Sequence, residues 1–186
     1  MAHIQTIQHQ EAEARLKIIY DEILLKRGQL AEVHKIQSLN PETIVQHMEL
    51  YMGIMFSHSP LSRAEREMLA VVVSAANNCA YCQHHHGSAL NQYWKDGQKV
   101  KSLRNDYKIL ELTVRERALC DYAHNLTLNP QEYEGQHKLT ELKEAGFEDR
   151  AILDATLVIS YFNFVNRMVL SLGVTLEEDK GEGYKY

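Results

Sequence analysis

Two cysteines, a run of histidines and a carboxylate lie close together near the middle of the chain. Cys79 and Cys82 form a C-x-x-C motif, and three consecutive histidines, residues 84–86, follow it. Glu67 opens the apolar stretch that precedes the motif. No other part of the sequence concentrates thiols, imidazoles and an acid within twenty residues. Residues 67–86 are therefore the candidate site.

These residue types permit a redox cycle at the two thiols. A free thiol has a pKa of about 8.5, and a helix N-terminus or a nearby imidazole favours the reactive thiolate. A carboxylate behind the imidazole would orient it. Two thiols one helical turn apart can close a disulfide, so that one attacks a substrate and the other resolves the product. Because His86 is at i+4 from Cys82 and shares its helix face, we expect Cys82 to attack and Cys79 to resolve.

The relay needs a turn between the acid and the histidine. Asn77 and Asn78 are poor mid-helix residues and good turn residues, which predicts two helices joined as a hairpin. In an antiparallel pair, Glu67 and His86 would face each other. In one unbroken helix, Glu67 and Cys79 would instead lie about 18 Å apart, because each residue rises about 1.5 Å.

The rest of the chain reads as further helices, and no segment shows sustained two-residue alternation, so we predict an all-α fold. The first helix of the hairpin begins at a capping box formed by Ser62 and Glu65, and Thr113 and Glu116 form another. The other predicted helices span residues 10–27, 29–37, 41–56, 79–94, 129–146 and 148–172, and residues 95–106 form a connection with a short helix. We expect a single helical domain over 1–175 and a charged tail over 176–186.

The second half of the sequence echoes the first. Leu39-Asn40-Pro41 recurs as Leu128-Asn129-Pro130, and the stretch after Arg150 resembles the stretch before the cysteines when Cys79 is set on Asn163 and Cys82 on Asn166. An old internal duplication would explain this, and so would shared helical composition.

Composition narrows the class of protein. The 186 residues carry a net charge of −5, which argues against a nucleic-acid partner. The polar N-terminus lacks the apolar core of a signal peptide, and three cysteines are an odd number for a secreted disulfide framework. Asp154 and Arg167 interrupt the most apolar stretch, 151–173, so we expect a buried or interface helix there and no membrane span. These features predict a cytoplasmic protein.

The pattern E-x11-C-x-x-C-x3-H, formed by Glu67, Cys79, Cys82 and His86, resembles that of AhpD-type alkylhydroperoxidases in the carboxymuconolactone decarboxylase superfamily. The similarity covers about residues 40–175 and is greatest to a peroxidase-related branch. In this sequence Tyr81 stands where some members have a histidine, and a tyrosine cannot act as a base at neutral pH.

The resemblance implies an AhpD-like helical fold with a central hairpin and a homo-oligomer, whether dimer, trimer or hexamer. It implies a thiol peroxidase that works without a metal or other cofactor, and in which the second cysteine attacks the hydroperoxide. A Glu67–His86 pair would relay the proton, and an external thiol reductant, lipoyl-type or thioredoxin-like, would restore the dithiol. Decarboxylase members lack the paired cysteines, which counts against that activity.

Other interpretations of the same motif stay open. The cysteines with a histidine could bind zinc, as in a metal-dependent lyase or hydrolase, or could simply pack. The disulfide could also be the switch of a non-enzymatic redox sensor or oligomer. His85, at i+3 from Cys82, could take the place of His86.

Several neighbouring residues have a structural alternative as well. Glu67 could form an ion pair with Arg63 or Arg66 on the helix surface. Cys120 lies on an apolar helix face and is expected to be a core thiol. Asn163 and Asn166 are expected to pack against the hairpin or a neighbouring subunit, or to contact the substrate.

Overall fold

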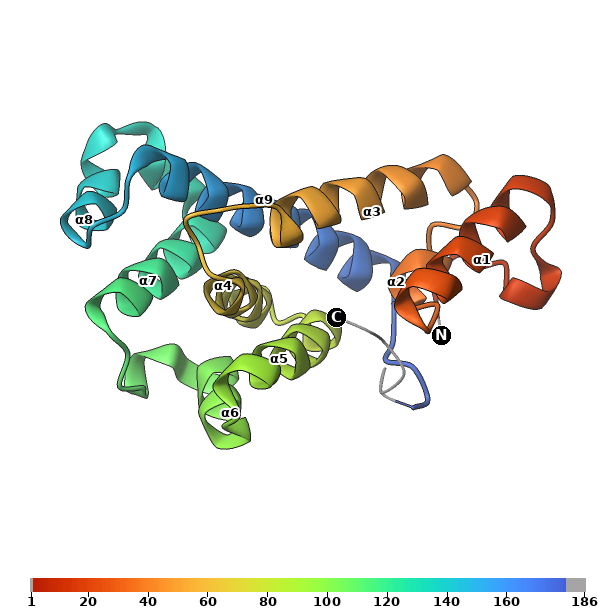
Figure 1. Cartoon of the computed structure of the whole chain (residues 1–186), viewed down its shortest axis with the longest axis horizontal. Helices are drawn as coiled ribbons and strands as arrows, with labels where there is room; N and C mark the ends of the chain where they lie inside the picture. The colour runs from red at the N-terminus through yellow and green to blue at the C-terminus, as the bar shows by residue number, and fades with distance from the viewer. Residues whose placement is uncertain (1, 180–186) are drawn as a thin grey trace. The chain divides into compact units, whose positions relative to one another are not determined.

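Helices make up the ordered framework of the protein (Figure 1). The computed structural model describes residues 2–179, and within that range it contains nine α-helices and no strand, which confirms the all-α prediction. The α-helices are α1 (Ala14–Arg27), α2 (Glu32–Lys35), α3 (Pro41–Phe56), α4 (Arg63–Ala76), α5 (Ala80–Trp94), α6 (Gly97–Asp106), α7 (Val114–Leu128), α8 (Thr140–Glu144) and α9 (Asp149–Leu172). Short 3-10 segments are η1 (His9–Glu11), η2 (Tyr107–Ile109), η3 (Pro130–Glu134) and η4 (Gln136–Leu139).

The chain divides into two compact units, with boundaries inside α3 and α9. One unit comprises the residues up to Met52 together with those from Arg167 onward, and the other comprises Gly53–Asn166. All four residues of the predicted site lie in the second unit. The single domain expected over 1–175 stays a prediction.

The first unit has an apolar core of its own around α1, formed by Ala12, Leu16, Ile19, Tyr20, Ile23, Leu30 and Ile44. The first residues of the predicted tail belong to this unit, because the Glu177 carboxylate accepts a hydrogen bond of 2.8 Å from the backbone N–H of Glu32 at the start of α2. Residues 180–186 of the tail lie outside the described range.

Helix α4 is the central helix of the second unit. Its capping box is confirmed, because Ser62 Oγ accepts from Glu65 N at 3.2 Å and the Glu65 carboxylate accepts from Ser62 N at 2.7 Å. Every residue from Arg66 to Ser74 is buried. The helix packs against α5 and α7, and α5 packs in turn against α6 (Figure 1). The burial of Met68 to Val73 explains why the sequence MLAVVV is apolar all round.

The predicted turn at Asn77 and Asn78 is confirmed. Asn78 has a left-handed backbone with φ of 55°, a conformation that asparagine tolerates better than most residues. Its N–H donates to Ala75 O at 3.0 Å, and the N–H of Cys79 donates to Ser74 O at 2.8 Å. These two bonds form a Schellman motif that ends α4 and lets α5 turn back along it.

This turn gives a direct test of the hairpin. We expect Asn78→Val to lower the free energy of unfolding by about 1–2 kcal/mol, because a β-branched residue disfavours positive φ, and Asn78→Gly to be tolerated. Urea unfolding measures both. Asn105→Val is the matched control, since Asn105 is also exposed but lies within α6. Equal losses at the two positions would contradict the role assigned to the turn.

One segment differs from the sequence-based expectation. The single helix predicted over 129–146 is wrong: the structure has η3, η4 and the five-residue α8 there, and Gly135 is extended between the first two. The helix predicted over 148–172 is confirmed as α9, which continues unbroken through the positions aligned with the cysteine hairpin. In that alignment Tyr161 and Phe162 stand opposite the two turn asparagines, and aromatic residues do not favour the left-handed turn.

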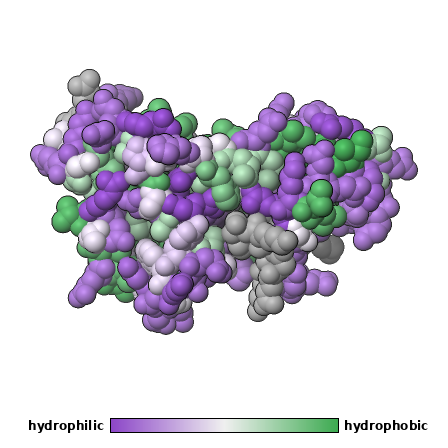
Figure 2. Space-filling view, viewed as in Figure 1, coloured by the Kyte–Doolittle hydropathy of each residue, from purple (hydrophilic) through white to green (hydrophobic). Residues whose placement is uncertain are grey.

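Helix α9 alone among the described helices is long and apolar enough to cross a membrane, and 44% of its most apolar window is buried. Core helices of globular proteins have the same character, so this is weak evidence for a span. The buried face includes Ala155, Val158, Ile159 and Phe162. On the face drawn in Figure 2, hydrophilic residues predominate and hydrophobic ones gather in separate patches.

Candidate active site

The hairpin brings Glu67 and His86 into direct contact. Nδ1 of His86 lies 2.7 Å from Oε2 of Glu67. Because an ionised carboxylate only accepts, Nδ1 carries the hydrogen of this bond, and in the neutral ring Nε2 is the unprotonated nitrogen. The His86 ring packs edge-on against Phe162, with the ring centroids 4.4 Å apart. The predicted pairing of acid and imidazole across the hairpin is therefore present in the structure.

Glu67 also pairs with Arg63, in the interior and not on the helix surface as the alternative had it, and this ion pair coexists with the relay geometry. Nε of Arg63 donates to Oε1 at 3.0 Å, and Nη2 donates to the same oxygen. The guanidinium is fixed from behind, because it lies 3.5 Å from the Phe56 ring centroid and donates to Met55 O. Arg66 instead donates to backbone carbonyls at the end of α3.

The electrostatics of Glu67 favour its charged form. The side chain is fully buried, and burial alone would raise its pKa. The charges and hydrogen bonds of His86 and Arg63 outweigh that effect, so the pKa of Glu67 is lowered. A buried carboxylate held between two cationic or donor groups is suited to orienting the imidazole, since neither of its oxygens is without a partner.

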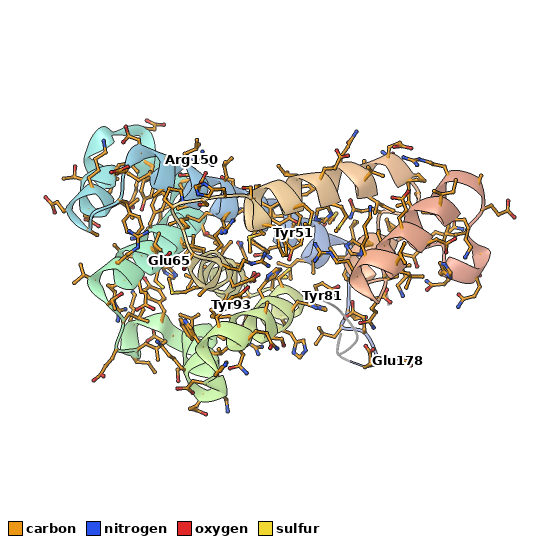
Figure 3. The ribbon with its side chains drawn as sticks, viewed as in Figure 1. Tyr51, Glu65, Tyr81, Tyr93, Arg150 and Glu178 are labelled. Carbon is orange, nitrogen blue, oxygen red and sulfur yellow. The ribbon has the colours of Figure 1, made fainter. Side chains whose placement is uncertain are left out.

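The two thiols lie at the start of α5. Cys79 is the N-cap residue, and Cys82 is in the first turn of the helix. Tyr81, the residue before Cys82, is labelled in Figure 3. Their exposed fractions are 0% and 2%, and neither is in a disulfide. The two thiols are within hydrogen-bonding reach of each other, and two backbone N–H groups of this turn approach the sulfur of Cys79.

This arrangement divides the charge of the dithiol unequally. The hydrogen bond from Cys82 and the backbone donors lower the pKa of Cys79, whereas the same bond and burial raise the pKa of Cys82. The two thiols titrate as an interacting pair, and this environment favours the first negative charge on Cys79. Attack by Cys82 therefore requires its proton to move first, either to Cys79 or to a base.

The remaining candidates have other surroundings. His85 is buried against Tyr81, with the ring centroids 4.5 Å apart, and it is His86 that contacts Glu67. Cys120 on α7 is fully buried and burial raises its pKa, which confirms the expected core thiol. Among the side chains that the structure describes, no group of three or more histidine, cysteine or acidic residues has the arrangement of a metal site.

Sequence reasoning gave too little weight to a set of amides and hydroxyls behind the thiols. Asn77 in the turn donates to the side-chain oxygens of both Asn163 and Asn166 at 3.0 Å. Asn166 is fully buried and hydrogen-bonds to Cys82. The sequence did contain a signal for this set: Asn163 and Asn166 are three residues apart in an otherwise apolar helix, and this spacing places both on one face.

Comparisons with known proteins agree with this architecture. Residues 41–105 match the carboxymuconolactone decarboxylase family. The chain is 30% identical to an uncharacterized peroxidase-related protein from Silicibacter sp. TM1040, over 96% of this chain and 95% of the other, with a TM-score of 0.84. The chain therefore belongs to the AhpD/carboxymuconolactone decarboxylase superfamily, and these matches support a general alkylhydroperoxidase-like role.

Two more distant structures share the fold. The alkylhydroperoxidase AhpD core protein from Ralstonia eutropha JMP134 is 23% identical, with 98% of this chain and 96% of the other covered and a TM-score of 0.86. The debrominase Bmp8 is 18% identical, with coverages of 97% and 95% and a TM-score of 0.77. The AhpD-like fold predicted from the sequence is thereby confirmed.

Proposed function

We propose that the protein is a thiol-dependent peroxidase that reduces hydroperoxides through the Cys79–Cys82 pair. The Cys82 thiolate attacks the distal peroxide oxygen, the O–O bond breaks, and the alcohol or water leaves with a proton. Cys82 is then a sulfenic acid. Cys79 attacks its sulfur, water leaves, and a disulfide forms. Two electrons and two protons from an external dithiol restore the pair.

The observation that carries this proposal is the 2.7 Å contact between Glu67 and His86 in the hairpin that also holds both thiols. The contact orients an imidazole on the α5 face that Cys82 shares. Nε2 can then take the thiol proton and return it to the leaving oxygen. Tyr81 stands beside this site on α5 (Figure 3) but cannot supply a second base at neutral pH.

The partners follow from the chemistry. A dithiol reductant, lipoyl-type or thioredoxin-like, is needed because each turnover consumes two electrons. We also propose a cytoplasmic location, where such reductants are maintained, and a homo-oligomeric state. Large apolar side chains exposed on this chain, such as Leu153, Leu157 and Phe164 of α9, favour further association.

The second candidate is a redox sensor, and burial of the thiols favours it. With exposed fractions of 0% and 2%, neither sulfur is open to a bulky reductant in this conformation. A sensor would form the disulfide once and recover slowly. Turnover number separates the two functions, because both begin with the same oxidation.

Peroxide consumption by the purified protein tests the proposal. The assay supplies hydrogen peroxide or cumene hydroperoxide with dihydrolipoamide or dithiothreitol as reductant, and 2,3,4-tribromopyrrole serves as an alternative substrate because a debrominase shares the fold. Many turnovers per chain with a hydroperoxide would support the peroxidase. One turnover only would support the sensor. Reaction with the bromopyrrole alone, or zinc in the purified protein, would overturn the proposal.

A further inference from the structure

Five polar side chains cluster in the otherwise apolar interior behind the cysteine pair. They come from the end of α4, the hairpin turn, α7 and α9, and they are Ser74, Asn77, Thr127, Asn163 and Asn166. Three of them are buried and the other two are half-buried. Buried polar groups need hydrogen-bond partners, so the way each amide points is decided by its neighbours.

Backbone carbonyls anchor one end of the cluster. Thr127 Oγ1 donates to Ala123 O at 2.7 Å, which uses its only hydrogen, so it must accept from Asn163 Nδ2 at 3.1 Å. The same Nδ2 donates to Ile159 O at 3.0 Å. Since a carbonyl only accepts, the nitrogen of Asn163 must face Ile159 and Thr127. Its Oδ1 is left facing the hairpin turn.

The orientation of the Asn163 amide fixes that of Asn77, which in turn fixes that of Asn166. Asn163 Oδ1 accepts from Asn77 Nδ2, and the second hydrogen of that nitrogen goes to Asn166 Oδ1, both at 3.0 Å. The oxygen of Asn166 therefore faces the turn. Its Nδ2 faces the opposite way, where it donates to Ser74 Oγ at 3.2 Å and hydrogen-bonds to Cys82. While the rest of the network is intact, Asn166 can present only its N–H, and not its oxygen, to the sulfur of Cys82.

We propose that Asn166 is a positioning residue for Cys82: its amide N–H, oriented through Asn163 and Asn77, holds the sulfur and stabilises its thiolate. This proposal rests on the proposed function only in assigning Cys82 as the attacking thiol. A hydrogen bond to a charged group is roughly twice as strong as one to a neutral group, so the donor favours ionisation. It acts against burial, which disfavours the thiolate in this apolar surrounding.

The test measures thiol ionisation without any peroxide. The background is Cys79→Ala, which removes coupling between the two sulfurs. Alkylation of Cys82 by iodoacetamide is followed over a range of pH by peptide mass spectrometry, with and without Asn166→Leu. We expect Asn166→Leu to move the midpoint upward by about one pH unit and to slow alkylation at neutral pH roughly tenfold.

Thr156→Val is the matched control. Thr156 on α9 hydrogen-bonds to Tyr122 on α7 at 2.7 Å. The Asn163–Thr127 hydrogen bond joins the same two helices, so Thr156→Val removes a comparable polar contact between them. It should lower stability and leave the Cys82 midpoint unchanged. Asn163→Ala is the second test variant, in case Asn166→Leu does not fold. It frees the amide orientation and should move the midpoint in the same direction by less.

An unchanged midpoint in Asn166→Leu, or an equal change in Thr156→Val, would overturn the assignment. If Asn166→Leu does not fold, an unchanged midpoint in Asn163→Ala would overturn it. Failure of the peroxidase proposal gives a different result, namely a normal Asn166 effect on alkylation together with no peroxide turnover. The two proposals therefore fail separately.

Discussion

Cys82→Ser is expected to abolish thiol-dependent peroxide turnover, with a loss in kcat/KM on the order of 10⁴-fold or more. A serine hydroxyl has no accessible anion near neutral pH and cannot form the sulfenic acid on which the cycle depends. Peroxide consumption under steady-state conditions measures the loss. Cys120→Ala is the matched control, because Cys120 is a fully buried core thiol on α7, and it should keep the wild-type rate.

Cys79→Ser should separate attack from resolution. This variant should consume one equivalent of peroxide per chain and then stop, leaving a sulfenic acid on Cys82 that a dimedone adduct reveals by mass. The charge distribution of the resting dithiol makes the comparison decisive, since Cys79 carries the lowered pKa. A dimedone adduct on Cys79 in Cys82→Ser, formed at the wild-type rate, would reverse the two roles.

The second large effect is expected at Glu67. Glu67→Leu should lower the free energy of unfolding by about 3 kcal/mol, because it leaves the Arg63 guanidinium largely buried without its anion. It should also remove the group that orients His86, and peroxide turnover should fall with the stability. Urea unfolding of the purified variant gives the first number, and steady-state turnover gives the second.

A double variant isolates the charge pair. Arg63→Met with Glu67→Leu removes both charges and keeps apolar volume, so it should recover much of the stability lost in Glu67→Leu. Turnover should stay low, because His86 still lacks its acceptor. If Arg63→Met restored turnover as well, Glu67 would be a structural ion-pair partner only.

The pH dependence of stability follows from the lowered pKa of Glu67. A carboxyl group with a lower pKa in the folded state stabilises the protein above its unfolded-state pKa, about 4.3, and this contribution is lost as the pH falls through the folded-state pKa. The stability difference between the wild type and Glu67→Leu should therefore be full at neutral pH and shrink in acid. Urea unfolding at a series of pH values measures it, and a constant difference would contradict the assignment.

Local sequence signals determined a large part of this protein. The capping boxes at Ser62 and Thr113 set two helix starts because their bonds lie within one turn of chain. The two asparagines predicted the hairpin because one of them must adopt positive φ. Spacing within one helix puts Cys82 and His86 on one face, and the predicted hairpin then sets Glu67 against His86.

Only the tertiary structure decided what surrounds those residues. The segment after Asn129 has capping signals but too little apolar periodicity to hold one helix, so its neighbours determine its form. The spacing of Glu67 could not show whether its side chain faces solvent or the core. In the structure it is fully buried and contacts both Arg63 and His86. An amide exchanges its donor and acceptor positions by a simple flip, so only its hydrogen-bond partners determine which way it points. For Asn166 that direction depends, through Asn163 and Asn77, on the Ile159 carbonyl of α9 and the Thr127 hydroxyl of α7.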